Sequence, residues 1–293
     1  MNFTTDEWII KIPNRLNVSM QSYNILANLQ HTILETDERK IILDFSNTVY
    51  VSALYMAFLG SLEVLCRKKN QKLVYRLRKD TELYHYFQSS GLYEFMRPRE
   101  SFVDKNAIPF SLINMEEDSI MSYINRILDL APVTLNPEAR AFLFTNIYEI
   151  FSNSSEHSES DCGVFACGHW MQRKKKLAFS VYDMGIGIPG AIRKYKDASM
   201  SSEDALRWAL KTGNSTKQLN DGVPRGIGLP NILDFINLNK GALYVLSNDI
   251  FYSYENGKEH FETFKYSIRG TMISLIIISD DEYIYELKEE LQC

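Results

Sequence analysis

The stretch NIYEIFSNSSEH, residues 146–157, holds the first side chains that could do chemistry. Glu149, Asn153 and His157 follow one another at intervals of four. A helix turns about 100° per residue, so all three would share one stripe. A carboxylate can activate water, and an amide oxygen can bind Mg²⁺. The alternative for Glu149 and Asn153 is two solvated helix residues. The imidazole fits a helix end, where the dipole favours a cation, and has no assigned role.

A second candidate element is Asp183-Met-Gly185-Ile-Gly187-Ile-Pro189, which directly follows a strand-like run. It has no Gly-x-x-Gly continuation, so it is not a dinucleotide-binding fingerprint. A carboxylate at a strand end can accept a hydrogen bond from an exocyclic amino group, and glycines let a flat base approach the backbone. A plain glycine-rich turn capped by Asp183 is the alternative interpretation.

A third element, Arg225-Gly226-Ile-Gly228-Leu-Pro230, opens a helix. Uncrowded backbone amides at a helix start are a natural phosphate site. Lys217 precedes them and could add a positive charge on the same phosphates. The alternative for Lys217 is a solvated lysine of a surface segment.

The surrounding elements must bring these residues together. Asn136 and Pro137 are the start signals of a long helix that carries Glu149 and Asn153. Two strand-like runs joined by RKKK then predict a hairpin that ends at Asp183. Residues 190–225 mix short helical pieces with Gly, Ser, Asn and Pro, which is typical of a mobile functional segment. A short helix ending at Gly241, antiparallel strands and a small acidic helix complete the chain.

The amino-terminal third has a different pattern. Residues 38–78 alternate strand, helix and strand, which predicts a βαβ unit with parallel strands. We place a boundary near residue 105, where periodicity is weak. Residues 116–131 form an amphipathic helix that we expect to link the domains and pack between them.

Composition narrows the function classes. The chain has 293 residues, 45% hydrophobic and 24% charged, with a net charge of −5, so nucleic acid is disfavoured as a partner. No apolar run is long enough to span a bilayer and no signal peptide is visible, so we expect a cytoplasmic protein. Cys162, Cys167 and His169 could be zinc ligands, but a fourth is missing and small core residues are the favoured interpretation.

The order of the three elements resembles the Bergerat-fold (GHKL) ATPase family over residues 132–280. That family includes gyrase-type topoisomerases, sensor histidine kinases and anti-sigma-factor serine kinases. The sequence resembles the last two groups more than the first. The resemblance implies ATP and Mg²⁺ as ligands. It implies that Asn153 coordinates Mg²⁺ and that Glu149 is the general base.

The same resemblance assigns the adenine and phosphate ends of the site. Asp183 would accept the adenine amino group, helped by Thr271, while Gly185 and Gly187 shape the base pocket. Gly226, Gly228 and Lys217 would hold the phosphates under a lid of residues 190–225.

The segment IILDFSNTVYVSALYMAFLGSL resembles the strand-turn-helix of STAS domains, in which a serine at the helix start is phosphorylated. Ser52, Ala53 and Leu54 occupy the positions of that family's Asp-Ser-Ser tripeptide here, so the usual acceptor position is apolar. Ser52, in the place of the family's aspartate, is the remaining candidate phosphosite. The expected fold is α/β, with a STAS-like domain (1–105), a linker helix (106–131), a Bergerat-fold sandwich (132–280) and an acidic tail (281–293). Its sheet should be mixed, largely antiparallel, with helices on one face.

The favoured function is an Mg-ATP-binding regulatory protein whose lid closes on nucleotide and controls a protein partner bound at the STAS-like domain or the lid. Slow ATP hydrolysis or protein-serine kinase activity would be its chemistry. Histidine autophosphorylation is disfavoured because the 116–131 helix has no histidine. The alternatives are a non-catalytic scaffold stabilised by ATP and a DNA-remodelling ATPase, which would need a transducer domain that this sequence does not show. The oligomeric state is open, a homodimer being one option.

Overall fold

The N-terminal unit is a three-stranded parallel sheet with helices packed against it. The computed structural model describes residues 7–96, 107–114, 116–131, 135–157, 160, 162–211 and 228–279. The sheet order is β1-β3-β5 and every pairing is parallel, with Ile42 opposite both Ile9 and Val74. The elements of this unit, residues 7–96, are β1 (Glu7–Lys11), β2 (Arg15–Leu16), α1 (Met20–Glu35), β3 (Lys40–Asp44), β4 (Tyr50–Val51), the 3₁₀ turn η1 (Ala53–Tyr55), α2 (Met56–Lys68), β5 (Lys72–Arg76), α3 (Glu82–Ser89) and α4 (Leu92–Met96). The predicted parallel βαβ unit is confirmed as β3-α2-β5.

The C-terminal unit, residues 107–279, is built on a seven-stranded sheet. Its order is β11-β10-β9-β12-β8-β7-β6, and all six pairings are antiparallel. The strands are β6 (Ala107–Ile113), β7 (Val164–Met171), β8 (Lys176–Asp183), β9 (Ala242–Ser247), β10 (Ile250–Glu255), β11 (Lys258–Thr263) and β12 (Thr271–Ile278). The β7-β8 hairpin is confirmed. The expected mixture of parallel and antiparallel strands is absent from the strands that the structure describes.

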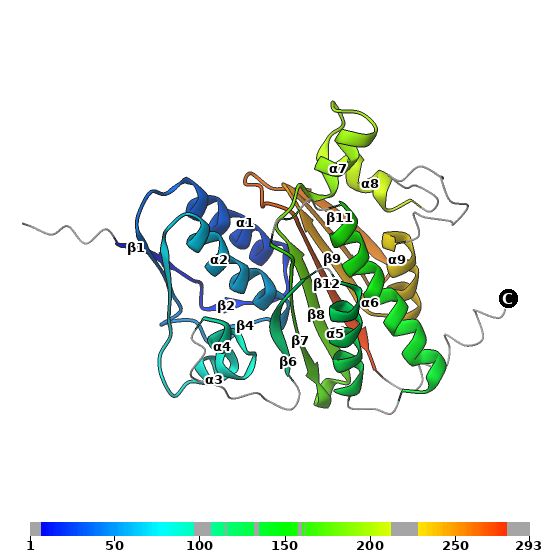
Figure 1. Cartoon of the computed structure of the whole chain (residues 1–293), viewed down its shortest axis with the longest axis horizontal. Helices are drawn as coiled ribbons and strands as arrows, with labels where there is room; N and C mark the ends of the chain where they lie inside the picture. Colours follow the sequence, from blue (N-terminus) through cyan, green and yellow to red (C-terminus); the bar gives the residue numbers. More distant parts are fainter. Residues whose placement is uncertain are drawn as a thin grey trace, which may run out of the picture.

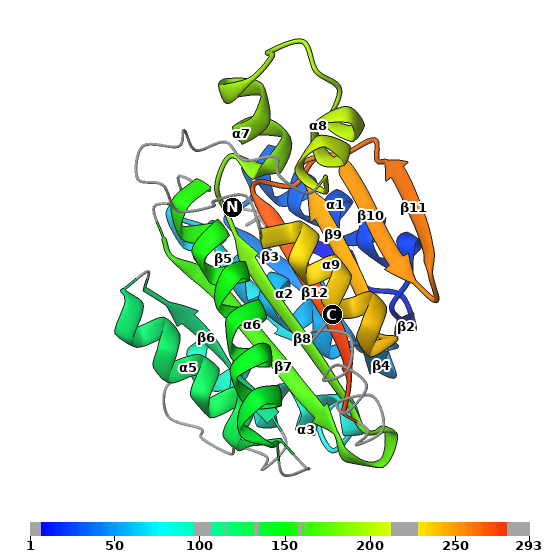
Figure 2. The ribbon, with the colours of Figure 1, turned by 90° about the vertical axis from the view of Figure 1, so that its right-hand side faces the viewer.

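Three helices cover one face of this sheet (Figure 2). They are α5 (Glu117–Asp129), α6 (Pro137–His157) and α9 (Gly228–Asn239). The predicted start of α6 is confirmed, because the Asn136 Oδ1 accepts a hydrogen bond from the Ala139 backbone N–H at 2.8 Å. Two shorter helices, α7 (Gly187–Tyr195) and α8 (Ser202–Ala209), stand above the end of the sheet where β8 finishes (Figure 1).

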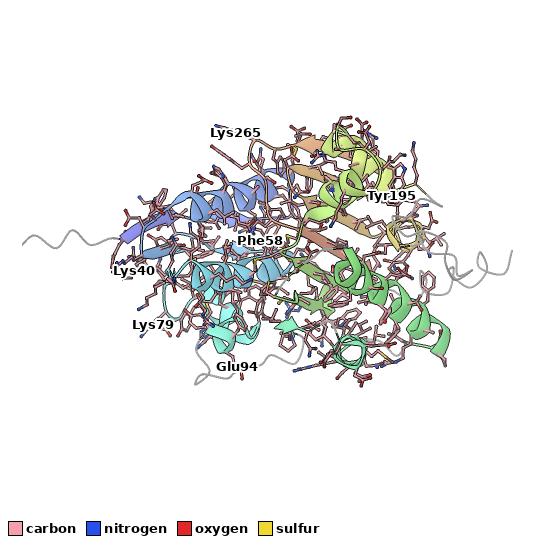
Figure 3. The ribbon with its side chains drawn as sticks, turned by 45° about the horizontal axis from the view of Figure 1, so that its top comes forward. Lys40, Phe58, Lys79, Glu94, Tyr195 and Lys265 are labelled. Carbon is pink, nitrogen blue, oxygen red and sulfur yellow. The ribbon has the colours of Figure 1, made fainter. Side chains whose placement is uncertain are left out.

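The other face of the sheet is covered by the N-terminal unit, so this sheet does not have helices on one face alone (Figure 1). One hydrophobic cluster runs through α1 and α2 into β7, β8, β9 and β12. The Phe58 ring lies 5.1 Å from the Tyr182 ring, and the Tyr23 ring lies 4.9 Å from the Phe251 ring. Figure 3 shows Phe58 at this junction. The two units therefore share a core.

The segment that we expected to link the units belongs to the C-terminal unit. Residues 106–131 hold the edge strand β6 and the helix α5. The α5 helix packs on α6 and β6, on the face opposite the N-terminal unit, and not between the units. Pro109 and a register shift after Ile108 hide the strand in the sequence, since proline and bulges are tolerated at a sheet edge.

Some expectations fall outside the described residues. These are the acidic tail (281–293) and the part of the expected lid from residue 212 to 225. No helix in the described ranges is both long and apolar enough to cross a membrane.

Candidate functional site

Asp183, Thr271 and Ser247 form a polar row across three adjacent strands. Thr271 pairs with Asp183 on one side and with Ser247 on the other. Side chains alternate between the faces of a strand, so the row continues the face of Val181, Ile273 and Val245, against which the helices pack. The apolar face thus ends in three polar groups at one end of the sheet.

Asp183 is a buried carboxyl group at the end of β8. It is 2% exposed, and the Gly185 backbone N–H donates to its Oδ1 at 2.9 Å. Burial raises the pKa of Asp183 to about 7, against the opposing effect of hydrogen bonds from the Gly185 and Thr271 backbones. A ligand N–H donor at this carboxylate would favour its ionised form.

Hydroxyl groups tie the row to the start of α7. The Ser247 and Thr271 hydroxyl oxygens are 2.8 Å apart, and the Ile188 backbone N–H donates to the Ser247 Oγ at 2.8 Å. These hydrogen bonds hold the end of the D-x-G-x-G segment against β9 and β12, so the segment is not an isolated surface turn.

Two glycines allow the backbones to meet here. Gly270 has φ +82°, and a Cβ on it would lie 2.0 Å from the Asp183 carbonyl oxygen. Gly187 has φ +76°, and a Cβ on it would lie 2.4 Å from the Asn248 Oδ1. Both positions exclude a side chain on conformational and steric grounds.

The end of α6 reaches the same end of the sheet. Ala139, Phe142 and Leu143, in the first turns of this helix, line a small cavity with Ile277 and Ile278 at the far end of β12. The later turns of the helix therefore run toward Thr271. Glu149 and Asn153 are half-buried on this part of the helix. The Asn153 Nδ2 is buried and has no hydrogen-bond partner among the described residues. A buried amide of this kind is costly unless a ligand or water satisfies it.

The start of α9 also faces this end. Asn239, at its last turn, donates to the Ile278 carbonyl at 2.8 Å and accepts from the Ile278 N–H at 2.7 Å. Because these bonds fix the C-terminus of α9 at the far end of β12, its first residue, Gly228, lies toward Thr271. Gly226 and Lys217 are outside the described residues, as is the side chain of His157.

Ser52 is not brought together with these residues. It is 3% exposed and its Oγ accepts a hydrogen bond from the Leu54 N–H at 3.3 Å, at the start of η1. It lines a cavity of about 520 Å³ with Lys174, Lys176 and Lys240. Lys176 is at the opposite end of β8 from Asp183, about 23 Å away along the strand.

No zinc site is present in the part of the chain that the structure describes. It contains no group of three or more His, Cys, Asp or Glu side chains that could hold a metal. Cys167 is buried, and burial raises the pKa of its thiol to about 12. A thiol in this environment is a core residue and a poor metal ligand.

The residues present fit a magnesium nucleotide. The Asn153 Nδ2 is an unsatisfied buried donor that a phosphate oxygen could accept from, its amide oxygen is of the kind that Mg²⁺ binds, and Asp183 supplies a buried acceptor beside a hydroxyl pair. Mg²⁺ keeps several waters and takes one or two protein oxygens together with phosphate oxygens, so a single protein amide is compatible with it.

Three residues of this site were not anticipated. Ser247 ends an apolar strand, Gly270 precedes Thr271, and Asn248 follows Ser247 with φ +53°. Asn248 donates to the Ile186 carbonyl at 3.2 Å, so it holds the D-x-G-x-G segment from the side of β9. In the sequence, the polar residue that ends the apolar run of β9 could have pointed to Ser247, and the glycine directly before Thr271 could have pointed to Gly270.

The sequence matches no protein-family model and no curated protein.

The contact between Gly270 and Asp183 gives a stability prediction. Gly270→Ala should lower the free energy of unfolding by about 3 kcal/mol or more, because alanine meets both a positive φ and the Asp183 backbone. Gly257→Ala is the matched control, since Gly257 has φ +72° and no atom within 4 Å of its Cβ position. It should cost about 1 kcal/mol. Equal losses in urea unfolding would contradict the proposed contact.

The raised pKa of Asp183 gives a pH prediction. The folded protein holds this proton up to pH about 7, whereas the unfolded chain loses it near 3.8. The contribution of Asp183 to the free energy of unfolding is therefore fully present below pH 4. It is lost as the pH rises to 7, which lowers the free energy of unfolding by at most about 4 kcal/mol. Asp183→Asn should flatten that slope between pH 5 and 7.

Asp44→Asn is the control for this experiment. The pKa of Asp44 is lowered by hydrogen bonds from Ser46, so Asp44 is ionised in both states above pH 5. Urea unfolding at several pH values measures the slopes. A wild-type slope equal to that of Asp183→Asn would show that the Asp183 proton is not retained.

Proposed function

We propose that the protein is an Mg-ATP-binding regulatory protein of the GHKL superfamily, with a Bergerat-fold C-terminal unit and a STAS-like N-terminal unit. The observation that carries the proposal is the buried Asp183 carboxyl group at the end of β8, beside Thr271 and the two close backbone approaches that Gly270 and Gly187 permit. The antiparallel sheet with α6 and α9 on one face is compatible with this fold.

The adenine end is proposed at the polar row. An exocyclic amino group would donate to Asp183, and the Thr271 hydroxyl would support it directly or through water. A hydrogen bond to a charged acceptor is worth roughly 1.5–3 kcal/mol. A guanine carbonyl in that position would face a carboxylate, so the row favours adenine.

The phosphate end is proposed between α6 and the start of α9. Asn153 would hold Mg²⁺ through its amide oxygen, and bound ATP would bring an acceptor within reach of its orphan Nδ2. The first amides of α9 point toward the same end of the sheet and favour an anion. Gly226, Gly228 and Lys217 are the proposed contacts to the phosphates.

Glu149 would orient the attacking water or the acceptor hydroxyl. It precedes Asn153 by one helical turn, so both side chains lie on one stripe of α6. When bound, Mg²⁺ would polarise the phosphate oxygens. The proposed chemistry is slow hydrolysis or transfer to a protein serine, under a lid that includes α7 and α8.

A non-catalytic scaffold stabilised by ATP is the second candidate. The continuous core between the two units favours it, because a large apolar interface restricts rigid-body motion between domains. A partner would bind the STAS-like unit or the lid in either case, and a pull-down with and without ATP tests nucleotide dependence.

Asp183→Asn should weaken Mg-ATP binding at least about tenfold, because the amide replaces one acceptor of the adenine amino group with a donor. Titration calorimetry measures the Kd. Asp44→Asn, at a half-buried carboxylate of the N-terminal unit, should leave the Kd unchanged. An unaltered affinity in Asp183→Asn would remove the adenine assignment.

Glu149→Ala should reduce phosphate release from Mg-ATP by about 100-fold in single-turnover experiments, as expected for loss of a general base. Thr145→Ala, at an exposed position one turn earlier on α6, is the matched control and should keep wild-type rates. If the wild type releases no more phosphate than Glu149→Ala and labels no protein, the scaffold is the correct function.

A further inference from the structure

Gln30 is a buried amide in an otherwise apolar helix stripe. Its neighbours on the stripe of α1 are Tyr23, Leu26, Ala27 and Ile33, all buried at helical spacing. Gln30 itself is 0% exposed. An unpaired amide there would be strongly destabilising, so its partners define its role.

These partners lie in the C-terminal unit. The Gln30 Nε2 donates to the Tyr182 Oη at 2.8 Å. The Tyr182 Oη donates to the Arg269 carbonyl at 2.6 Å, and the Arg269 N–H donates to the Gln30 Oε1 at 2.6 Å. The three bonds close a triangle, named here the Gln30 triangle (Gln30, Tyr182 and Arg269).

Two corners of the triangle adjoin the proposed adenine site. Tyr182 directly precedes Asp183, and Arg269 precedes Gly270 and Thr271. Both backbone polar groups of Arg269 are fixed, which leaves little freedom for the next residue. A Cβ on Gly270 would lie 2.0 Å from the Asp183 carbonyl oxygen, so no side chain fits between these two backbones. Gln30 therefore ties α1 to the two chain segments that lead into Asp183 and Thr271.

A second contact from α1 supports the same loop. The His31 ring stacks on the Tyr266 ring at 4.4 Å, in the loop between β11 and β12, which reaches α1 in Figure 1. On the opposite side the Ile268 N–H donates to the Asn248 carbonyl at 2.9 Å. The loop is thus held between the N-terminal unit and the β9-β10 turn.

We infer that Gln30 is a positioning residue for adenine recognition, by which the N-terminal unit holds the Asp183–Thr271 end of the nucleotide site in its binding geometry. The inference rests on the proposed function. Gln30 makes no contact with the nucleotide itself. Its loss acts on the adenine end, where sub-ångström placement of an acceptor decides the hydrogen bond, and spares the phosphate end on α6 and α9.

The first test compares two buried glutamines. Gln30→Met removes the triangle and keeps the length of the side chain. Gln71→Met is the matched control, since Gln71 is 8% exposed and its Nε2 donates to the Thr36 and Glu38 carbonyls at 2.9 and 3.0 Å, within the N-terminal unit. Each variant removes a glutamine of the N-terminal unit that makes two side-chain hydrogen bonds, but only those of Gln30 cross to the C-terminal unit.

The readout is the Kd for Mg-ATP and for Mg-GTP, measured by displacement of a fluorescent ATP analogue well below the unfolding temperature. Gln30→Met should weaken ATP roughly tenfold and GTP less, so that the preference for adenine falls. Gln71→Met should keep the wild-type preference. A merely structural role of Gln30 would leave the ratio of the two Kd values unchanged, and that result overturns the inference.

A second pair keeps the test valid if Gln30→Met does not fold. Tyr182→Phe removes only the central oxygen of the triangle, and Tyr75→Phe removes a buried hydroxyl that donates to the Leu59 carbonyl inside the N-terminal unit. Only Tyr182→Phe should lower the preference for ATP, and equal ratios in the pair overturn the inference. Failure of the wild type to bind Mg-ATP overturns the proposed function. If the wild type binds Mg-ATP and the variants keep its ratio of Kd values, only the inference about Gln30 is overturned.

Discussion

The structure depends on burial of the seven-stranded sheet on both faces. Helices α5, α6 and α9 cover one face and the N-terminal unit covers the other. Buried apolar surface contributes roughly 25 cal/mol per Å². Removal of the N-terminal unit would therefore be costly, because it would expose large side chains of the sheet such as Tyr182 and Phe251. The N-terminal unit is therefore part of the fold of the C-terminal unit.

Two-sided burial also explains the properties of Asp183. In a sheet with one solvated face, a strand-end carboxylate would stay hydrated and its pKa would stay low. Here Tyr182 and Val181 are buried on opposite faces, so Asp183 lies in a site closed on both sides and its pKa rises to about 7. A ligand N–H donor that reached the carboxylate would recover the cost of this burial.

The sequence was informative where a pattern is local. The start of α6 at Asn136, the β7-β8 hairpin and the strand end at Asp183 follow from capping, turn and alternation signals. The apolar runs LAFSVYD and TMISLIII predicted strands, but the expected sheet had helices on one face and the cover of the other face was not foreseen. Gln30 contacts partners 152 and 239 residues away in sequence, and no local pattern can show such contacts. The edge strand β6 was hidden by Pro109.

Shared burial restricts how a nucleotide signal could pass between the units. Rotation of the N-terminal unit would break the apolar cluster around Phe58 and Tyr182, so it is disfavoured. Ser52 is on the other face and at the other end of β8 from Asp183, too far for direct contact. The Gln30 triangle and the β11-β12 loop instead join α1 to the strand ends that carry Asp183 and Thr271. Small movements of those strand ends would reach α1 through hydrogen bonds, without separating the two units.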